Sequence, residues 1–311
     1  MTHSVECEAP PCVTAFMSIL LTGATGFIGS SVLRRLIDEG HSVTALVRHP
    51  TKAAQVRAAG ATALVGDARD IDLVADASEA SEGVIHLASS KDVDHDFITA
   101  VFSGLEGSDK PFIHTGGIWT YGSNPDITES SPVDPPELTS WRGVNESRVR
   151  DSLGIRTIVI APGIVYGYGK GIPNDIVGAP VTDTTPPTLR LIGDGTQHWA
   201  TVHVDDLAAL YVLALENAAA GSTYIGASGQ NPTVRQLVET AAQAAGLAGV
   251  TAESADASRE RLGAGYADAL LLDQQATGSR ARIDLGWEPN GPSLVEELTS
   301  GTYAPQRAAL G

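Results

Sequence analysis

Short apolar runs alternate with amphipathic stretches of helical length along the first half of the chain. Runs typical of buried strands span residues 18–22, 42–47, 62–65, 83–87, 111–115 and 155–160. Between them, apolar residues recur at helical spacing over residues 26–38, 52–59, 71–77, 94–105 and 140–153. Strands that alternate with helices in this way form βαβ units around a parallel sheet. The pattern therefore predicts an α/β fold with a doubly wound parallel sheet.

The pattern changes after residue 160. Residues 161–190 are rich in Gly, Pro, Thr and Asp without a sustained period, which is typical of a lid or a binding loop. Order returns with a strand at 201–204, a helix from Asp205 or Asp206, a strand at 223–225, a helix at 234–245 and mostly helical sequence to residue 298. We expect a first domain over residues 17–160, onto which residues 201–217 pack, and a smaller C-terminal lobe with its lid over residues 161–200 and 218–311.

The charge of the chain excludes several classes of partner. Its 311 residues include 37 Asp and Glu against 20 Lys and Arg, a formal net charge of -17, with no block rich in Lys or Arg. A phosphate backbone or an anionic membrane would be repelled by such a protein. No apolar run approaches the length of a membrane span. We expect a cytoplasmic protein with a small-molecule substrate and with neither a nucleic-acid nor a membrane partner.

The first sixteen residues differ from the remainder. Both cysteines, Cys7 and Cys12, lie there in a stretch that contains Pro and shows no periodic pattern. The stretch lacks the basic start and the long apolar centre of a signal peptide, and a chain otherwise free of cysteine fits a reducing compartment. We expect residues 1–16 to be a disordered extension, or the result of an upstream start before Met17, without a disulfide framework.

A glycine-rich turn follows the first expected strand. The sequence Thr22-Gly23-Ala24-Thr25-Gly26-Phe27-Ile28-Gly29 joins that strand to a helix. Gly23 permits a tight turn, Gly26 lets the backbone approach a pyrophosphate, and Gly29 lets the helix pack against the strand. The pyrophosphate then lies at the positive end of the helix. At the start of a βαβ series the motif predicts a Rossmann-type dinucleotide site, whereas alone it would be a glycine turn.

The residue after the second strand indicates which dinucleotide is bound. Arg48 stands where an acid would accept hydrogen bonds from the ribose of NAD, and an arginine there pairs with the 2′-phosphate of NADP. His49 and Lys52 add positive charge nearby. A solvated surface arginine is the alternative. We expect NADP(H) to be preferred over NAD(H).

These motifs make the chain resemble the extended short-chain dehydrogenase/reductases of the NAD-dependent epimerase/dehydratase type. Residues 22–29 match the TGxxGxxG motif of that family, and residues 66–67, 84–88, 161–167, 203–208 and 285–289 resemble its later segments, so that the resemblance covers residues 18–298. It implies cofactor contacts from Gly23, Thr25, Gly26, Phe27, Ile28, Asp67, Ala68, Leu87, Ala88, Ser89, Thr115, Pro162, Gly163 and Ile164. It also implies a possible homodimer formed through a pair of helices.

The catalytic positions depart from the family pattern. The family places a Ser or Thr four residues before the tyrosine of a YG pair, but four residues before Tyr121 lies Gly117. The YxxxK pair of the family is replaced by Trp141 and Asn145. An indole does not release a proton at useful pH, and an amide supplies no cation. The resemblance therefore implies an atypical member that keeps the nucleotide site without the usual acid.

Replacement catalytic residues are sought among the hydroxyls and cations nearby. Thr115 at the end of the fifth strand could orient substrate or cap the strand, and Tyr121 could donate a proton or be packing. Arg142 could supply the missing cation or form an i, i+4 ion pair with Glu146. Asn145 could hydrogen-bond a ribose hydroxyl of the cofactor or pack within the helix.

Candidate substrate contacts lie later in the chain. Tyr166 and Tyr168 belong to the expected lid, and His198 and Trp199 flank the strand that returns to the sheet. Lys170 is read as a solvated loop lysine and His203 as a buried histidine. No set of His, Cys, Asp and Glu has metal-ligand spacing, so no metal is expected.

Together these observations predict an NADP(H)-dependent oxidoreductase that reduces a small carbonyl or imine, or oxidises the alcohol. Hydride transfer of this kind needs the cofactor and a proton donor or hydrogen bond at the atom that becomes negative. Two alternatives stay open. One is a nucleotide-sugar epimerase or dehydratase, and the other is a protein that binds NADP(H) without turnover as a regulator.

Overall fold

The computed structural model describes residues 16–305. The predictions for Cys7, for Cys12 and for residues 1–15 as a disordered extension therefore lie outside the described residues. No helix within residues 16–305 combines the length and the apolar content that crossing a membrane requires.

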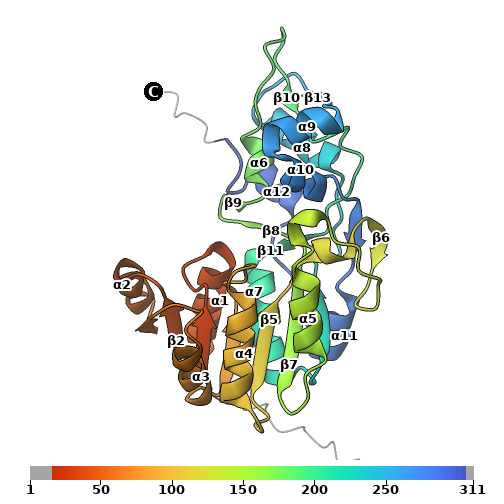
Figure 1. The fold of residues 1–311 in the computed structure, drawn as a ribbon. Coiled ribbons are helices and arrows are strands. Elements are labelled where there is room, and N and C mark those ends of the chain that lie inside the picture. Colours follow the sequence, from red (N-terminus) through yellow and green to blue (C-terminus); the bar gives the residue numbers. More distant parts are fainter. Residues whose placement is uncertain (1–15, 306–311) are drawn as a thin grey trace, which may run out of the picture.

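A seven-stranded parallel sheet forms the centre of the molecule (Figure 1). Its order is β12-β7-β5-β4-β1-β2-β3. The strands are β1 (Ser18–Thr22), β2 (Ser42–Val47), β3 (Thr62–Val65), β4 (Gly83–His86), β5 (Pro111–Thr115), β7 (Arg156–Pro162) and β12 (Ser222–Gly226). The central strands are almost continuously apolar because helices cover both faces of the sheet. The predicted α/β fold with a doubly wound parallel sheet is confirmed.

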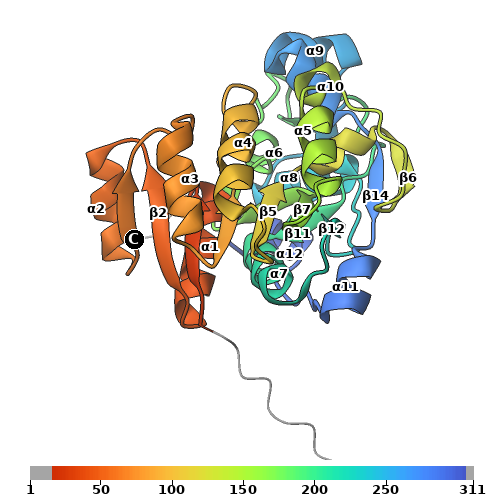
Figure 2. The same ribbon diagram turned by 60° about the horizontal axis from the view of Figure 1, so that its bottom comes forward.

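Helices cover the sheet in two layers (Figure 2). One apolar core lies under α3 (Ile71–Glu79), α4 (Asp94–Leu105) and α5 (Arg142–Arg150). A second and larger core on the other face is formed with α1 (Phe27–Asp38), α2 (Pro50–Ala58) and α7 (Val204–Asn217).

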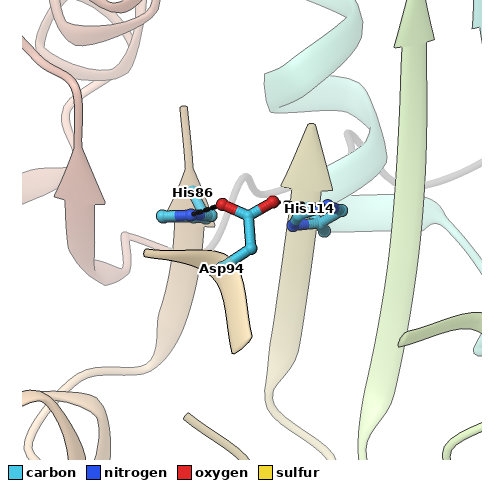
Figure 3. A group of neighbouring side chains, drawn as sticks. All are labelled: His86, Asp94 and His114. Atoms are coloured by element: carbon cyan, nitrogen blue, oxygen red, sulfur yellow. Dashed lines mark hydrogen bonds and ion pairs between the residues drawn. The ribbon is translucent and has the colours of Figure 1, made fainter. Parts of the chain in front are cut away.

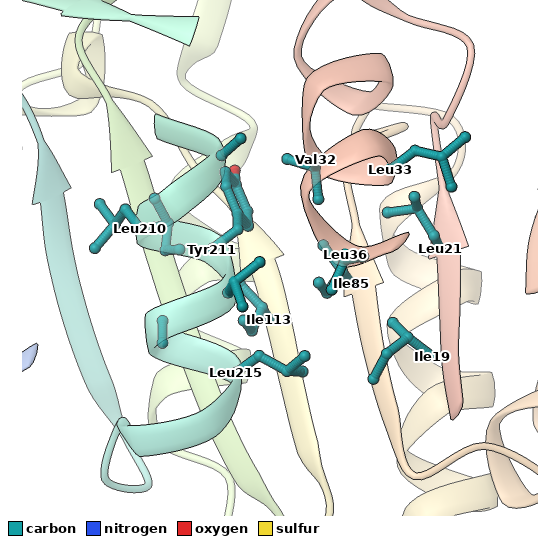
Figure 4. Close-up of a cluster of buried hydrophobic side chains, with 14 of the residues drawn as sticks. Ile19, Leu21, Val32, Leu33, Leu36, Ile85, Ile113, Leu210, Tyr211 and Leu215 are labelled. Atoms are coloured by element: carbon teal, nitrogen blue, oxygen red, sulfur yellow. The ribbon is translucent and has the colours of Figure 1, made fainter. Parts of the chain in front are cut away.

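Helix α7 packs beside α1, although about 170 residues of sequence separate the two (Figure 4). Leu210, Tyr211 and Leu215 of α7 and Val32 and Leu36 of α1 are fully buried in the same core. Helix α7 therefore packs on the main sheet together with α1.

A smaller lobe stands above the carboxyl ends of the sheet strands in Figure 1. It contains α6 (Asn174–Val177), α8 (Val234–Ala244), α9 (Ala255–Leu262), α10 (Ala264–Leu270), α12 (Leu294–Thr299) and the strand pair β10 (Leu189–Arg190) and β13 (Val250–Thr251). Its core includes Tyr166, Trp199 and Tyr303. Short segments lie between the two parts, namely β6 (Asn124–Ile127), β8 (Ile164–Gly167), β9 (Lys170–Gly171), β11 (Thr201–His203), β14 (Gln274–Ala276) and the 3₁₀ turns Ile118–Tyr121 and Glu137–Thr139. Helix α11 (Ser279–Leu285) packs on the main sheet against β12 and α7.

Two expectations about the second half need correction. The strand expected at 223–225 is not part of the smaller lobe, because β12 pairs with β7 and becomes the outer strand of the main sheet. Residues 161–190 are not uniformly irregular, because β8 pairs in parallel with β11 and antiparallel with β9. Strands of two to four residues leave too short a pattern to be read from sequence.

Candidate functional site

The turn between β1 and α1 is built for a close approach of backbone to ligand. Gly23 has φ +72°, and a Cβ on it would lie 2.9 Å from the carbonyl carbon of Leu87. A Cβ on Gly29 would lie 2.0 Å from the carbonyl oxygen of Gly23, so the first turn of α1 packs directly on the loop. Gly26 caps α1 without a side chain, and no acid occupies the first turn of the helix. The positive helix end is therefore open to an anion.

A cavity of about 410 Å³, here called the nucleotide cavity, opens at the carboxyl ends of β1 to β4. This is the edge of a doubly wound sheet at which dinucleotides bind. It is lined by Thr22, Gly23, Ala24, Thr25, Leu46, Val47, Arg48, His49, Lys52, Gly66, Asp67, Ala68, Leu87, Ala88, Ser89, Ser90 and Val93.

The nucleotide cavity has cations on one side. Arg48, His49 and Lys52 line it together after β2. The one carboxylate that lines it, on Asp67, is paired with Arg69, whose Nη2 and Nε lie 2.9 and 3.1 Å from its two oxygens. These hydrogen bonds lower the pKa of Asp67 to about 2. The lining thus offers positive charge where the second ribose of a dinucleotide lies.

A second cavity of about 270 Å³, here called the apolar cavity, continues from the first, since Leu87 and Ser89 line both. It lies at the carboxyl ends of β5 and β7, next to the smaller lobe. Its lining is mainly apolar and comprises Ile28, Leu87, Ser89, Thr115, Gly116, Gly117, Ile118, Trp119, Thr120, Thr139, Arg142, Pro162, Gly163, Ile164, Val165 and Ile172.

Arg142 is the one charged residue in the lining of the apolar cavity. Its Nη1 donates to Ser89 Oγ at 2.9 Å and to the carbonyl oxygen of Thr115 at 3.3 Å. Its guanidinium also lies 4.6 Å from the centre of the Trp141 ring, a cation–π distance. Within residues 16–305 no ion pair joins Arg142 to Glu146. The guanidinium is held against the cavity and not along its own helix.

A buried carboxylate holds Ser89 in place for Arg142. Asp94, at the first residue of α4, accepts from Ser89 Oγ and from the backbone N–H of Ser90, both at 2.7 Å. Burial raises the pKa of Asp94, but the hydrogen bond from His86 and the other partners outweigh it and leave the pKa below its ordinary value. The negative charge fixes the loop that both cavities share.

The hydrogen bonds of Thr22 decide which nitrogen of His86 carries the proton. Thr22 Oγ1 accepts from the backbone N–H groups of Leu87 and Ala88 at 3.1 and 3.2 Å, so its own hydrogen points to His86 Nδ1 at 2.7 Å. His86 Nε2 then carries the ring proton and donates to Asp94 Oδ1 at 3.3 Å. A connected chain of bonds thus runs from the end of β1 to Arg142.

His114 stands beside this chain without joining it (Figure 3). Its Nε2 lies 3.7 Å from Asp94 Oδ2, and neither ring nitrogen has a hydrogen-bond partner among the described residues. Burial, followed by the proximity of His86, lowers the pKa of His114 to about 3. His86, Asp94 and His114 are close enough together for a metal ion, but both oxygens of Asp94 already accept hydrogen bonds. We therefore assign the cluster to positioning of the loop.

Most predicted cofactor residues line one of the two cavities. Of these residues, the nucleotide cavity is lined by Gly23, Thr25, Arg48, Asp67, Ala68, Leu87, Ala88 and Ser89. The apolar cavity is lined by Ile28, Thr115, Pro162, Gly163 and Ile164. Gly26, Phe27 and Asn145 are absent from both linings. Gly26 caps α1, the ring of Phe27 lies against Gly171, and Asn145 is buried within α5.

The predicted catalytic residues have different surroundings. Arg142 and Thr115 both line the apolar cavity, but Thr115 Oγ1 is already hydrogen-bonded to the buried Tyr211 hydroxyl at 2.7 Å. Tyr121 is buried outside both linings, and burial together with the charges of Glu146 and Glu129 raises its pKa to about 12. This position favours packing, which was the alternative for Tyr121, over proton donation.

The four predicted substrate residues lie outside both linings. Trp199 is in the core of the smaller lobe and donates to the carbonyl oxygen of Leu270. Tyr166 is buried, and its hydroxyl donates a hydrogen bond to the carbonyl oxygen of Pro292 at 2.7 Å. Tyr168 bonds to Asp205 and Arg34, and His198 Nδ1 lies 2.8 Å from Asp273. Tyr166 and Trp199 thus pack within the smaller lobe, whereas Tyr168 bonds to residues of α1 and α7. Contact of the four residues with substrate stays a prediction.

Sequence reasoning missed the acids behind the site. Asp94 was read only as part of a helix, although an acid that starts a helix directly after a strand-end loop is a signal for loop anchoring. Glu146 was read as an ion-pair partner of Arg142, and Thr120 was not considered. In the structure Thr120 lines the apolar cavity and its hydroxyl donates to Glu146 Oε1 at 3.4 Å.

Comparisons with known proteins agree with this geometry. A family described as NAD(P)H-binding matches residues 23–116, and the NAD-dependent epimerase/dehydratase family matches residues 145–226. The first match contains most of the nucleotide cavity, and the second begins on α5 and ends with β12. Binding of NAD(P)H, as the glycine loop predicts, is confirmed at the level of the family.

Relatives of this family cover nearly the whole chain. An uncharacterised protein of Schizosaccharomyces pombe is 30% identical over 302 residues, which is 92% of this chain and 100% of that protein. The 2-alkyl-3-oxoalkanoate reductase of Stenotrophomonas maltophilia is 25% identical over 80% of this chain and 82% of its own. The crystal structure of the human epimerase family protein SDR39U1 with NADPH has the same fold, with a TM-score of 0.70 and 19% identity over 92% of this chain and 99% of that one. The chain therefore belongs to the NAD-dependent epimerase/dehydratase family of short-chain dehydrogenase/reductases, as an extended and atypical member.

Proposed function

We propose that this protein is an NADP(H)-dependent oxidoreductase that reduces a small, largely apolar carbonyl or imine compound, or oxidises the corresponding alcohol. The observation that carries the proposal is the continuity of the two cavities. One is lined by the glycine loop and by Arg48, Lys52 and His49, and the other by apolar side chains around the guanidinium of Arg142.

The residues present fit a dinucleotide. The glycine loop leaves a space that a Cβ at Gly23 would fill, and the N-terminus of α1 faces it. When bound, NADPH supplies a hydride to the substrate at the end of the nicotinamide, which the shared residues Leu87 and Ser89 would place at the apolar cavity. Arg48, with His49 and Lys52, would pair with the 2′-phosphate, which supports NADP(H) over NAD(H).

Arg142 would act on the substrate oxygen. A carbonyl oxygen gains negative charge as a hydride reaches its carbon, and a fixed cation in an apolar cavity stabilises that charge strongly. Ser89, Thr115 and Trp141 hold the guanidinium before substrate arrives. The apolar lining excludes water and favours a substrate with one polar group over a sugar, which supports reduction over sugar epimerisation. The name of the Stenotrophomonas maltophilia relative, a reductase of an oxo compound, supports the same direction.

Cofactor choice is tested by thermal unfolding with NADPH, NADP⁺, NADH and NAD⁺. A ligand that binds only the folded state raises the midpoint of unfolding, so NADPH should give the largest rise. Arg48→Ala should reduce the rise with NADPH much more than the rise with NADH. Arg57→Ala, also in the region of α2 but outside the cavity lining, serves as the control. Equal losses for both cofactors in Arg48→Ala would contradict the assignment.

Turnover is tested by NADPH absorbance with a panel of small aldehydes, ketones and cyclic imines. Arg142→Met should lower kcat/KM by about 100-fold or more while NADPH still stabilises the protein. Arg150→Ala, on the same helix but outside both cavity linings and bonded to Ser147 and Asp151, should change kcat/KM much less than Arg142→Met. Tight NADPH binding without turnover of any substrate would instead favour a regulator.

A further inference from the structure

Glu146 is a buried acid directly behind the apolar cavity. It lies on α5, one turn after Arg142, and only 6% of its surface is exposed. A Cβ on Gly116, which lines the cavity, would lie 2.7 Å from Glu146 Oε1. The missing side chain at Gly116 thus lets the carboxyl group lie against the floor of the cavity.

The buried carboxyl group of Glu146 has few partners that could stabilise a negative charge on it. Within residues 16–305 no ion pair reaches Glu146, because Arg142 is bonded to Ser89 and Thr115 instead. Its one recorded side-chain partner is the hydroxyl of Thr120, at 3.4 Å. Burial raises the pKa of Glu146, and the charge of Arg142 opposes that rise without cancelling it. The group therefore keeps its proton to a higher pH than an exposed glutamate.

Carbonyl reduction needs a proton that the usual residue does not supply here. Trp141 stands at the tyrosine position of the family pattern, and Tyr121 is buried with a pKa of about 12. Arg142 can stabilise charge on the oxygen but does not release a proton. Thr120 lines the cavity on one side and bonds to Glu146 on the other, so it connects the cavity to an acid.

We propose that Glu146 supplies the proton for the reduction, passing it to the substrate through the hydroxyl of Thr120. As the carbonyl carbon receives the hydride, its C–O π bond breaks and the oxygen takes the hydrogen of Thr120 Oγ1. For this step the protonated carboxyl group of Glu146 donates to Thr120 Oγ1, and the hydrogen of Thr120 turns to the substrate. Thr120 Oγ1 then takes the proton of Glu146, which is left as a carboxylate and is protonated again from water. The inference rests on the proposed function and adds the proton path to it.

The first test follows the carboxyl group in the cofactor-free protein. Burial also raises the pKa of Glu216, so carbon-13 labelling of glutamate side chains and NMR titration should show two carboxyl resonances that titrate above the range of the exposed glutamates. The resonance of Glu146 is the informative one. That resonance should be absent in Glu146→Gln and displaced in Thr120→Val. Thr157→Val removes an equally buried hydroxyl from β7, one with no hydrogen-bond partner among the described residues, and should leave the resonance unchanged.

The second test follows the rate of carbonyl reduction against pH, with the aldehyde or ketone that the wild type turns over fastest. The wild-type kcat should fall as pH rises through the pKa of Glu146, because only the protonated form donates. Glu146→Gln keeps the shape of the side chain but should lower kcat about 100-fold and remove the alkaline fall. Its KM and its stabilisation by NADPH should stay at wild-type values. Thr120→Val should reproduce the loss, and Thr157→Val should not.

Two results would overturn the inference. One is a Glu146 resonance that titrates with the exposed glutamates, and the other is a Glu146→Gln variant with wild-type kcat and an intact alkaline fall. If the wild type consumes no NADPH with any carbonyl or imine substrate, the proposed function fails and the proton path fails with it. Consumption by the wild type with an unaffected Glu146→Gln variant refutes the proton path alone.

Discussion

Adjacent glycines at the floor of the apolar cavity have opposite roles. Gly116 lies against a carboxylate oxygen of Glu146, whereas nothing lies within 4 Å of a Cβ placed on Gly117. Gly117 has φ −173°, an extended conformation that any residue adopts. The absence of the family's hydroxyl at residue 117 is therefore not imposed by lack of space, while a side chain at residue 116 would require the buried carboxyl group of Glu146 to move.

We expect Gly116→Ala to destabilise the protein by about 1–3 kcal/mol, because its Cβ forces Glu146 or the strand end to move. Gly117→Ala should change the free energy of unfolding by less than about 0.5 kcal/mol. Urea unfolding of both variants checks the pair. Equal stabilities would show that Glu146 moves aside without cost and would weaken the packing argument.

His114 should make the protein sensitive to mild acid. Its pKa is about 3 in the folded protein and about 6.5 in an unfolded chain. Below pH 6.5 the unfolded chain binds a proton that the folded protein excludes, so the stability that His114 contributes is full above that pH and is lost as pH falls toward 3. The charged or titratable groups that face His114 are His86 on β4, Asp94 on α4 and Arg142 on α5.

His114→Leu should therefore flatten the fall of stability between about pH 6.5 and about pH 4. The measurement is the urea midpoint at several pH values for the variant and the wild type. His95→Leu, which changes an exposed histidine of α4, should retain the wild-type slope. An unaltered slope in His114→Leu would show that other groups cause the acid sensitivity.

Among the elements, α7 stabilises the central sheet by packing on it. Leu215 is fully buried in the same core as α1. Its side chain packs so closely on Gly83 of β4 that a Cβ placed on this glycine would lie 3.0 Å from Leu215 Cδ1. We expect Leu215→Ala to lose about 2–5 kcal/mol, as core truncations do. Leu153→Ala, at a residue that is 93% exposed, should change stability by less than about 0.5 kcal/mol. Thermal or urea unfolding distinguishes the two.

The regular elements of the first domain could be predicted from sequence to within a few residues. β1, β2, β3 and β5 have the predicted bounds, since buried parallel strands give continuous apolar runs between glycine or polar turns. α5 is shorter than the predicted 140–153, because residues 140–141 are a turn and the helix ends at Arg150. The short strands β8 and β9 exist through pairing with distant partners, which a local pattern does not show.

The two cavities of the site also differed in how far they could be predicted from the sequence. The nucleotide cavity follows a local motif, so the glycines and Arg48 could be named from sequence. The apolar cavity depends on side-chain direction, which long-range contacts decide. Arg142 turns to Ser89, 53 residues away, and Trp199 turns into the lobe core. An aromatic residue that lies near a site in the sequence is therefore weak evidence for substrate contact, as long as the direction of its side chain is not known.

At the scale of the molecule, residues 16–160 do not contain a finished domain. The outer strand β12 and the covering helix α7 both come from residues after 200. We expect a fragment of residues 16–160 to show no cooperative unfolding by circular dichroism, to bind a dye for exposed apolar surface, and to gain no stability from NADPH. The full chain is the reference. Cooperative unfolding of the fragment with stabilisation by NADPH would contradict this view.

The late arrival of α7 also has a consequence during synthesis. When β7 leaves the ribosome, the face of the sheet that α7 will cover still exposes apolar side chains such as Ile113 and Ile158. At roughly 5–20 residues per second, translation from residue 161 to residue 226 takes about 3–13 seconds. Throughout that interval the nascent chain carries a half-covered sheet, so chaperones that bind apolar surface would find this protein at the stage between its sixth and its seventh sheet strand.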